Sequence, residues 1–163
     1  MKWVLIVTLV IATPILIVVS IGALLPREHV ASRTVALRQS PEVVWAQITG
    51  SPTWRPEIRS YEELPARNGH RVWRETDRHN QVITYEAVEA LAPQRLVVRI
   101  ADAKLPFGGT WTYMIAPQGS GSSLTITENG EVYNPVFRFV SRFVIGNSAT
   151  INSYINALQA SLR

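Results

Sequence analysis

The clearest pattern of apolar and polar positions lies in residues 134–163, at the end of the sequence. At 100° per residue, eight side chains fall within an arc of about 80°. They are Phe137, Val140, Val144, Ser148, Ile151, Ile155, Leu158 and Leu162. Arg138 and Arg142 fall on the opposite face, and Asn134 followed by Pro135 is typical of a helix start. The pattern predicts one amphipathic helix of about 28 residues, with Gly146 as the point where it would bend.

Alternating and β-branched runs upstream predict seven strands separated by short turns. Because the connections among the last six are short, consecutive strands should pair antiparallel. The predicted strands are residues 30–37, 60–64, 70–76, 81–91, 95–101, 110–116 and 122–132. Two short helices should follow the first strand, one starting at Ser40-Pro41 and one over Trp54-Arg55-Pro56-Glu57. The fold class is therefore α+β, with a curved seven-stranded antiparallel sheet wrapped around the long C-terminal helix.

Residues 3–25 carry no charged side chain and, as a helix, would be about 34 Å long, enough to cross a bilayer. Trp3 stands where an interfacial aromatic residue would, so the interpretation we favour is an uncleaved single-pass anchor. A cleaved signal peptide is the alternative, with Lys2 as its basic start and Ser20 and Gly22 as small residues near a cleavage site. The positive charges before and after this segment nearly balance, so the sequence does not decide on which side of the membrane the rest of the chain would lie.

The anchor hypothesis divides the chain into residues 1–26 and a domain of residues 27–163. The short connection would hold that domain against the bilayer.

The composition of the sequence excludes two classes of site. The sequence has no cysteine, which rules out disulfides and thiolate metal sites, and its net charge of +4 includes no basic run that would favour nucleic acid. The three histidines lack metal-ligand spacing, so we expect neither a metal nor a cofactor.

The element order and several short motifs resemble the START-like helix-grip superfamily, also called SRPBCC, between Glu28 and Leu162. The motifs are Ser40-Pro41-Glu42-Val43-Val44-Trp45, Trp54-Arg55-Pro56, Tyr85-Glu86 running to Pro93 and Arg95-Leu96-Val97, Gly109-Thr110-Trp111, residues 121–131, and Asn134-Pro135-Val136-Phe137-Arg138. The resemblance implies a deep, mostly apolar cavity between sheet and helix that takes a lipid, sterol, polyketide or similar molecule. It implies no catalytic motif, because the superfamily shares none.

Candidate ligand contacts follow from the strand faces and from the surplus of apolar residues in the first half of the last helix. They are Phe107, Trp111, Tyr113, Glu128, Phe137, Val140, Phe143 and Val144. Phe107 lies in an apolar segment, residues 105–107, that we expect to be a loop tip acting as a lid or lipid-dipping edge. Trp73 shares a face with Arg71 and Glu75, a pattern that favours the outside of the sheet.

Glu128 leaves two interpretations open. Its spacing from Leu124 and Ile126 points it inward, where it would bind a polar head group or act as a general acid. A bulge at Asn129-Gly130, the reading that we favour, would turn it outward.

The sequence therefore predicts a membrane-anchored protein that binds a hydrophobic or amphipathic small molecule, such as a lipid or isoprenoid. Residues 3–25 would contact the bilayer. Binding is favoured over catalysis because no acid–base or nucleophile set is evident. One alternative is an enzyme like the polyketide cyclases and dehydratases, with Glu128 or Tyr113 moving protons. Another is a protein-interaction module with a collapsed cavity. The sequence leaves the oligomeric state open.

Overall fold

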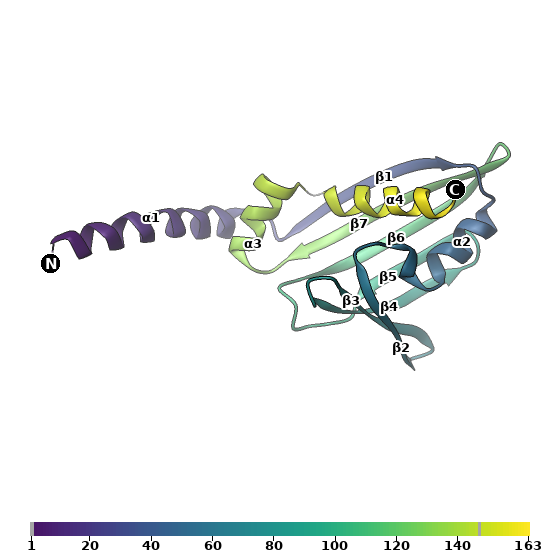
Figure 1. The fold of residues 1–163 in the computed structure, drawn as a ribbon, viewed down its shortest axis with the longest axis horizontal. Coiled ribbons are helices and arrows are strands. Elements are labelled where there is room, and N and C mark those ends of the chain that lie inside the picture. The colour runs from purple at the N-terminus through teal and green to yellow at the C-terminus, as the bar shows by residue number, and fades with distance from the viewer. Residues whose placement is uncertain (1, 147) are drawn as a thin grey trace.

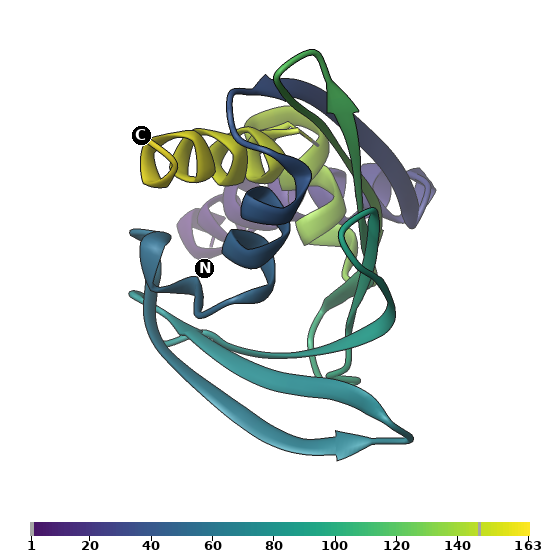
Figure 2. The same ribbon diagram turned by 90° about the vertical axis from the view of Figure 1, so that its right-hand side faces the viewer.

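The structure, a computed structural model, describes residues 2–146 and 148–163, with the backbone alone described at residues 4, 5, 7 and 145. One antiparallel sheet carries helices on its concave face, and a further helix projects from one end (Figure 1). The strands run in the spatial order β1-β7-β6-β5-β4-β3-β2. Their bounds are β1 Glu28–Leu37, β2 Ile58–Arg67, β3 His70–Asp77, β4 Val82–Leu91, β5 Arg95–Ile100, β6 Phe107–Gln118 and β7 Gly121–Val132. The sheet curls around the helices, as Figure 2 shows.

The helices fall into three groups along the chain. The helix α1 (Lys2–Leu24) precedes the sheet, whereas α2 (Pro41–Thr49) and the 3-10 turn η1 (Pro52–Trp54) connect β1 to β2. After β7 come α3 (Pro135–Val140), the π-helical turn η2 (Ser141–Ile145) and α4 (Ala149–Ser161). The structure confirms three predictions from the sequence: the α+β class, the sheet of seven antiparallel strands, and the helical segment after the last strand.

Local sequence explains most of these boundaries. Ser40 precedes Pro41 at the start of α2, as predicted, and the turn at Asn68-Gly69 has positive φ at both residues, as a tight hairpin requires. The second predicted helix is wrong in position. Helical turn forms over Pro52–Trp54, and Arg55 is extended because a residue before proline avoids the helical region.

The prediction of one continuous C-terminal helix is also wrong. The chain instead forms α3, η2 and α4, with Gly146 at φ +82° after the π-helical turn. Asn134 caps α3 as predicted, because its side chain accepts hydrogen bonds from the amides of Val136 and Phe137. Gly146, the expected bend, adopts a conformation that favours glycine and separates the two halves.

The two halves bury different faces. In α4 the predicted stripe is buried, with Ile151, Tyr154, Ile155 and Leu158 in the core. In α3 the predicted outer residue Arg138 is buried, whereas Phe137 of the stripe is 53% exposed. The reason is α1: Arg138 Nη1 donates to the carbonyl oxygens of Leu25 at 2.8 Å and Ala23 at 3.5 Å, which completes hydrogen bonds at the end of α1.

Gly22 brings α1 and α3 close together. A Cβ atom at position 22 would lie 1.9 Å from the carbonyl oxygen of Pro135, so a larger side chain would force the helices apart. The backbone contact and the Arg138 hydrogen bonds fix α1 against the first turn of α3. This junction places the projecting helix beside one end of the sheet (Figure 1).

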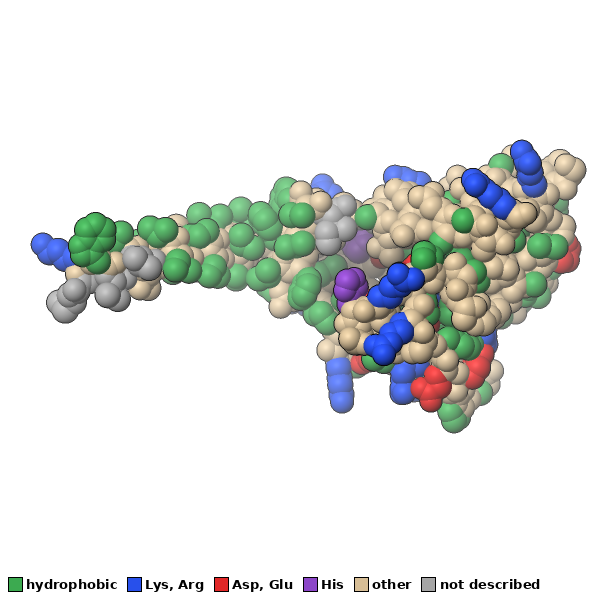
Figure 3. Space-filling view, in the orientation of Figure 1, with side chains coloured by type: hydrophobic (Ala, Val, Ile, Leu, Met, Phe, Trp, Pro, Cys, Tyr) green, Lys and Arg blue, Asp and Glu red, His purple; other side chains and the backbone are tan. Residues whose placement is uncertain are grey.

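Beyond this junction, α1 exposes apolar side chains along its length (Figure 3). Trp3 is 79% exposed, Leu9 is 65% exposed and Leu16 is 67% exposed. Among residues 2–146 and 148–163, no helix reaches the combined length and apolarity needed to cross a membrane. The structure therefore does not show the single-pass anchor that was expected over residues 3–25.

Candidate functional site

A cavity of about 1100 Å³ lies between the concave face of the sheet and the helices. The core beside it is formed by inward residues of the central strands and by α4, including Leu124, Ile126, Ile151 and Leu158. The cavity walls come from the strands, from α2 and η1, and from the α3–α4 region. Residues of both α2 and α4 line this cavity, so it lies between these two helices and the sheet.

Six of the eight candidate contacts lie on the cavity wall: Phe107, Trp111, Tyr113, Glu128, Phe137 and Val140. Phe143 and Val144 do not line it and are 60% and 72% exposed, although Ser141 at the start of the same π-helical turn does line the cavity. Phe107 is not a loop tip. It is the first residue of β6, pairs with Val132 of β7 and is half-buried. Of the predicted lid, only Leu105 and Pro106 lie outside the strand, in the bend that precedes it.

A group of aromatic rings forms much of the interior wall. Tyr154 of α4 lies 5.2 Å from the ring of Trp54, 5.7 Å from Trp111 and 5.6 Å from Tyr113, measured between ring centroids. On β3 and β4, the rings of Trp73 and Tyr85 stack with their centroids 5.6 Å apart. Burial raises the pKa of Tyr85, Tyr113 and Tyr154, which keeps all three phenols neutral at physiological pH.

A buried ion pair stands beside these rings. Arg55, extended between η1 and Pro56, donates from Nη2 to Glu75 Oε2, and Trp73 Nε1 donates to Glu75 Oε1 at 3.0 Å. Burial, the largest single influence, disfavours the charge of Arg55, but Glu75 together with Tyr154 and Tyr113 outweighs it, and the pKa of Arg55 is raised. Trp73 and Glu75 therefore face inward, contrary to the expectation of an outer face. The charge of Glu75 is tolerated inside the cavity because Arg55 neutralises it and both Arg55 and Trp73 donate hydrogen bonds to it.

Glu128 also lines the cavity, and the register between β6 and β7 runs without interruption through Trp111↔Glu128 and Gly109↔Gly130. No bulge turns the carboxylate outward. Its Oε1 lies 3.7 Å from His29 Nε2, and Trp111 is its second polar neighbour. Burial raises the pKa of Glu128, and His29 and Trp111 partly oppose that rise.

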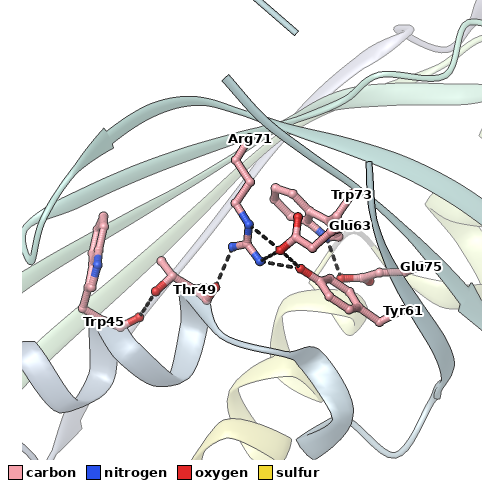
Figure 4. A network of polar contacts seen from close by, with 7 residues as sticks. All are labelled: Trp45, Thr49, Tyr61, Glu63, Arg71, Trp73 and Glu75. Atoms are coloured by element: carbon pink, nitrogen blue, oxygen red, sulfur yellow. Dashed lines mark hydrogen bonds and ion pairs between the residues drawn. The ribbon is translucent and has the colours of Figure 1, made fainter. Parts of the chain in front are cut away.

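A polar network joins α2 to the far strands at another part of the rim (Figure 4). Arg71 Nη1 donates to the carbonyl oxygen of Thr49 at 2.6 Å, and Arg71 Nε donates to Glu63 at 2.9 Å. Tyr61 also donates to Glu63, and burial together with this bond raises the pKa of Tyr61 to about 12. The Arg71 guanidinium lies 5.1 Å from the ring centroid of Trp73. These contacts hold the end of α2 against β2 and β3.

Several cavity residues were missed from the sequence. They are His29, Trp54, Arg55, Glu75 and Tyr154. Trp54 and Arg55 are adjacent, but no spacing along the chain links them to His29, Glu75 or Tyr154. Two signals could have found three of them: Trp54-Arg55-Pro56 is one of the resemblance motifs, and Tyr154 lies beside the apolar stripe of the last helix. Within the described residues, no group of three or more His, Cys, Asp or Glu side chains is placed to hold a metal ion.

A curved antiparallel sheet that encloses an aromatic-walled cavity against a C-terminal helix defines the START-like helix-grip class. The family model described as polyketide cyclase / dehydrase and lipid transport matches residues 28–157. The chain belongs to this family. No curated protein matches the sequence.

Solved structures share the fold at low sequence identity. A START superfamily protein from Mycobacterium smegmatis has a TM-score of 0.65 at 19% identity, with 82% of this chain and 97% of that chain covered. Norcoclaurine synthase from Thalictrum flavum has a TM-score of 0.62 at 11% identity, covering 83% and 86%. The di-domain ARO/CYC protein StfQ of the steffimycin biosynthetic pathway has a TM-score of 0.63 at 14% identity. The match covers 82% of this chain and 50% of that chain. These likenesses concern the fold.

Proposed function

We propose that this protein binds a hydrophobic or amphipathic small molecule, of lipid or isoprenoid size, in the cavity between sheet and α4. The observation that carries the proposal is the cavity itself. Its volume of about 1100 Å³ is slightly above the range that small-molecule sites commonly occupy, roughly 300–1,000 Å³. The family's description, which includes lipid transport, supports the same function.

The composition of the wall favours binding of an apolar body. The rings of Trp54, Trp111, Tyr113 and Tyr154 present broad surfaces, and the charge of Arg55 is neutralised by Glu75. Moving an apolar ligand from water onto such surfaces releases roughly 25 cal/mol per Å² of apolar area. A cavity collapsed by its own side chains, as the interaction-module alternative requires, would not leave this space.

Filling the cavity tests the proposal. Ala87 is buried on the cavity wall, so Ala87→Phe should occupy part of the ligand's space, whereas Ala36→Phe adds the same ring at an exposed position of β1. We expect Nile red fluorescence of the full chain to saturate with the wild type and Ala36→Phe, and to fall several-fold with Ala87→Phe. Fluorescence from dye bound to the exposed apolar surface of α1 is a background common to all three proteins. Equal fluorescence in all three, with melting temperatures preserved, would contradict cavity binding.

We further propose that the exposed apolar surface of α1 inserts into a lipid surface and brings the cavity to it. Monomeric soluble proteins seldom expose contiguous apolar patches of this extent. Four exposed apolar residues, which we call the apolar collar, lie on α3, which packs against α1, and on the following turn η2: Val136, Phe137, Phe143 and Val144. Phe137 belongs both to the collar and to the cavity wall, so a ligand could pass between lipid and cavity there.

An enzyme of the cyclase and dehydrase type is the second candidate. The observation in its favour is the Glu128–His29 pair, two proton-carrying groups on a ligand cavity. An enzyme would lose turnover, while retaining ligand affinity, when Glu128 is replaced by Gln. A pure binding protein would instead show a change in affinity with no chemical conversion of the bound molecule.

A further inference from the structure

Two little-exposed carboxylates of the cavity wall differ in how their oxygens are used. Both oxygens of Glu75 accept hydrogen bonds, one from Arg55 and one from Trp73. Glu128 is only 16% exposed in its side chain, and its Oε2 atom is buried without a hydrogen-bond partner among the residues that the structure describes. Trp111 and His29 favour the charged form of the carboxyl group, but neither is a hydrogen-bond partner of Oε2. An acceptor left unpaired in a protein interior costs free energy, so Oε2 can take a further donor.

The surroundings of Glu128 are shaped around a side-chain pair. His29 of β1 lies opposite Gly130 of β7, and a Cβ atom at position 130 would lie 2.2 Å from its imidazole ring. The absence of a side chain at Gly130 therefore lets the imidazole lie against β7, where its Nε2 reaches the Oε1 side of Glu128. The arrangement occupies one edge of the carboxylate and leaves Oε2 for another group.

We propose that Glu128 is the head-group site of the cavity and selects a ligand with a hydrogen-bond donor, a hydroxyl or a protonated amine, on an apolar body. The proposal rests on the proposed function, since it specifies the ligand of the same cavity. An ionised carboxylate only accepts hydrogen bonds, so Oε2 pairs with an N–H or O–H and with no ether, ester or carboxylate oxygen. A carboxylate ligand would also bring a second negative charge beside Glu128.

The neighbouring rings suit the apolar body of such a ligand. Trp111 contacts both Glu128 and the rings of Tyr113 and Tyr154, so the head-group site joins the aromatic wall directly. Phe107 and Val132, paired at the start of β6 and the end of β7, line the cavity at the same end of the strands. A flat or slender apolar group attached to the donor would lie along these surfaces.

Four ligands that share a naphthalene ring test the proposal. They are 2-(hydroxymethyl)naphthalene, its methyl ether, 2-(aminomethyl)naphthalene as the ammonium, and 2-naphthoate. Their affinities for the full chain would be measured at pH 8 by calorimetry. The alcohol and the ammonium should bind about tenfold or more tightly than the ether, the typical effect of a hydrogen bond to a charged group. Naphthoate should bind most weakly.

Two variants and a control assign the preference to Glu128. Glu128→Leu should bring the alcohol-to-ether ratio to about one, and Glu128→Gln, which keeps the shape, should lower it. Glu62→Gln removes an exposed carboxylate outside the cavity and should leave the ratio unchanged. If the wild type binds alcohol and ether equally well, or if the preference persists in Glu128→Leu, the head-group assignment is overturned while cavity binding stands. If none of the four ligands binds, the proposed function itself fails.

Discussion

At the residue scale, Glu128 and Glu75 show how position decides the use of the same side chain. Glu75 is neutralised by Arg55, whereas the polar neighbours of Glu128 in the described part of the chain are His29, 3.7 Å away, and Trp111. Burying a carboxylate without full compensation is unfavourable, and the raised pKa of Glu128 reports that cost. A residue kept in such a state is more readily explained by ligand recognition than by stability.

The raised pKa gives a signed prediction for stability. Because folded Glu128 holds its proton more tightly than the unfolded chain does, its contribution to the free energy of unfolding is present below the ordinary pKa of 4.5 and is lost as pH rises through the folded-state pKa. Glu128→Gln cannot lose a proton. Its melting temperature relative to the wild type should therefore increase between about pH 4.5 and 8. A difference that stays constant, or that shrinks with pH, would contradict the burial of this carboxylate.

Sequence reasoning reached part of this site. Period-two alternation places Glu128 on the inner face with Ile126, and the structure agrees, but the bulge expected at Gly130 does not form. Gly130 instead makes room for His29, which lies on another strand. Such a steric reason depends on strand pairing distant in the sequence, so no local pattern could indicate it. The Arg55–Glu75 pair was missed for the same reason.

At the element scale, the last thirty positions show what a helical pattern can and cannot predict. The stripe through Ile151, Ile155 and Leu158 is buried against the sheet, because that half of the segment has the sheet as its partner. The half that contains Phe137 and Arg138 has α1 as its partner, and the carbonyl oxygens at the end of α1 favour an arginine over an apolar face. A helical wheel drawn from one segment cannot identify the element that the helix packs against. For this reason the wheel assigned the wrong buried face to α3.

A matched pair of substitutions tests the orientation of α4. Ile155 is 8% exposed in the core, so Ile155→Ala should lower the free energy of unfolding by about 2–5 kcal/mol. Asn156, the next residue, is exposed, and Asn156→Ala should change it by less than about 0.5 kcal/mol. Denaturant unfolding followed by circular dichroism would measure both. Equal losses at the two positions would show that α4 presents a different face to the sheet.

At the scale of the whole molecule, the part of the chain that holds the cavity is joined to an exposed apolar helix through a close contact between α1 and α3. Gly22 and Arg138 fix α1 against α3, and α3 contributes Phe137 and Val140 to the cavity wall. Lipid contact along α1 would therefore be coupled to the position of the cavity.

The lipid proposal predicts co-flotation of the full chain with phosphatidylcholine vesicles. Ile11 and Ile15 are each 58% exposed and lie one turn apart on α1. The double substitution Ile11→Asp, Ile15→Asp should move the protein from the floating to the dense fraction, since each charge opposes insertion into hydrocarbon. Ala36→Asp on the exposed side of β1 is the control and should still float. Flotation of both variants would remove α1 as the lipid contact.

The presence of a small molecule inside the folded chain is the central claim, and native mass spectrometry measures it directly. The full chain would be incubated with a total lipid extract of its expression host and sprayed under non-denaturing conditions. We predict a wild-type mass increased by one small molecule per chain, and a bare mass for Ala87→Phe, whose cavity is partly filled. A bare wild-type mass, or the same adduct on both proteins, would contradict a ligand-binding cavity.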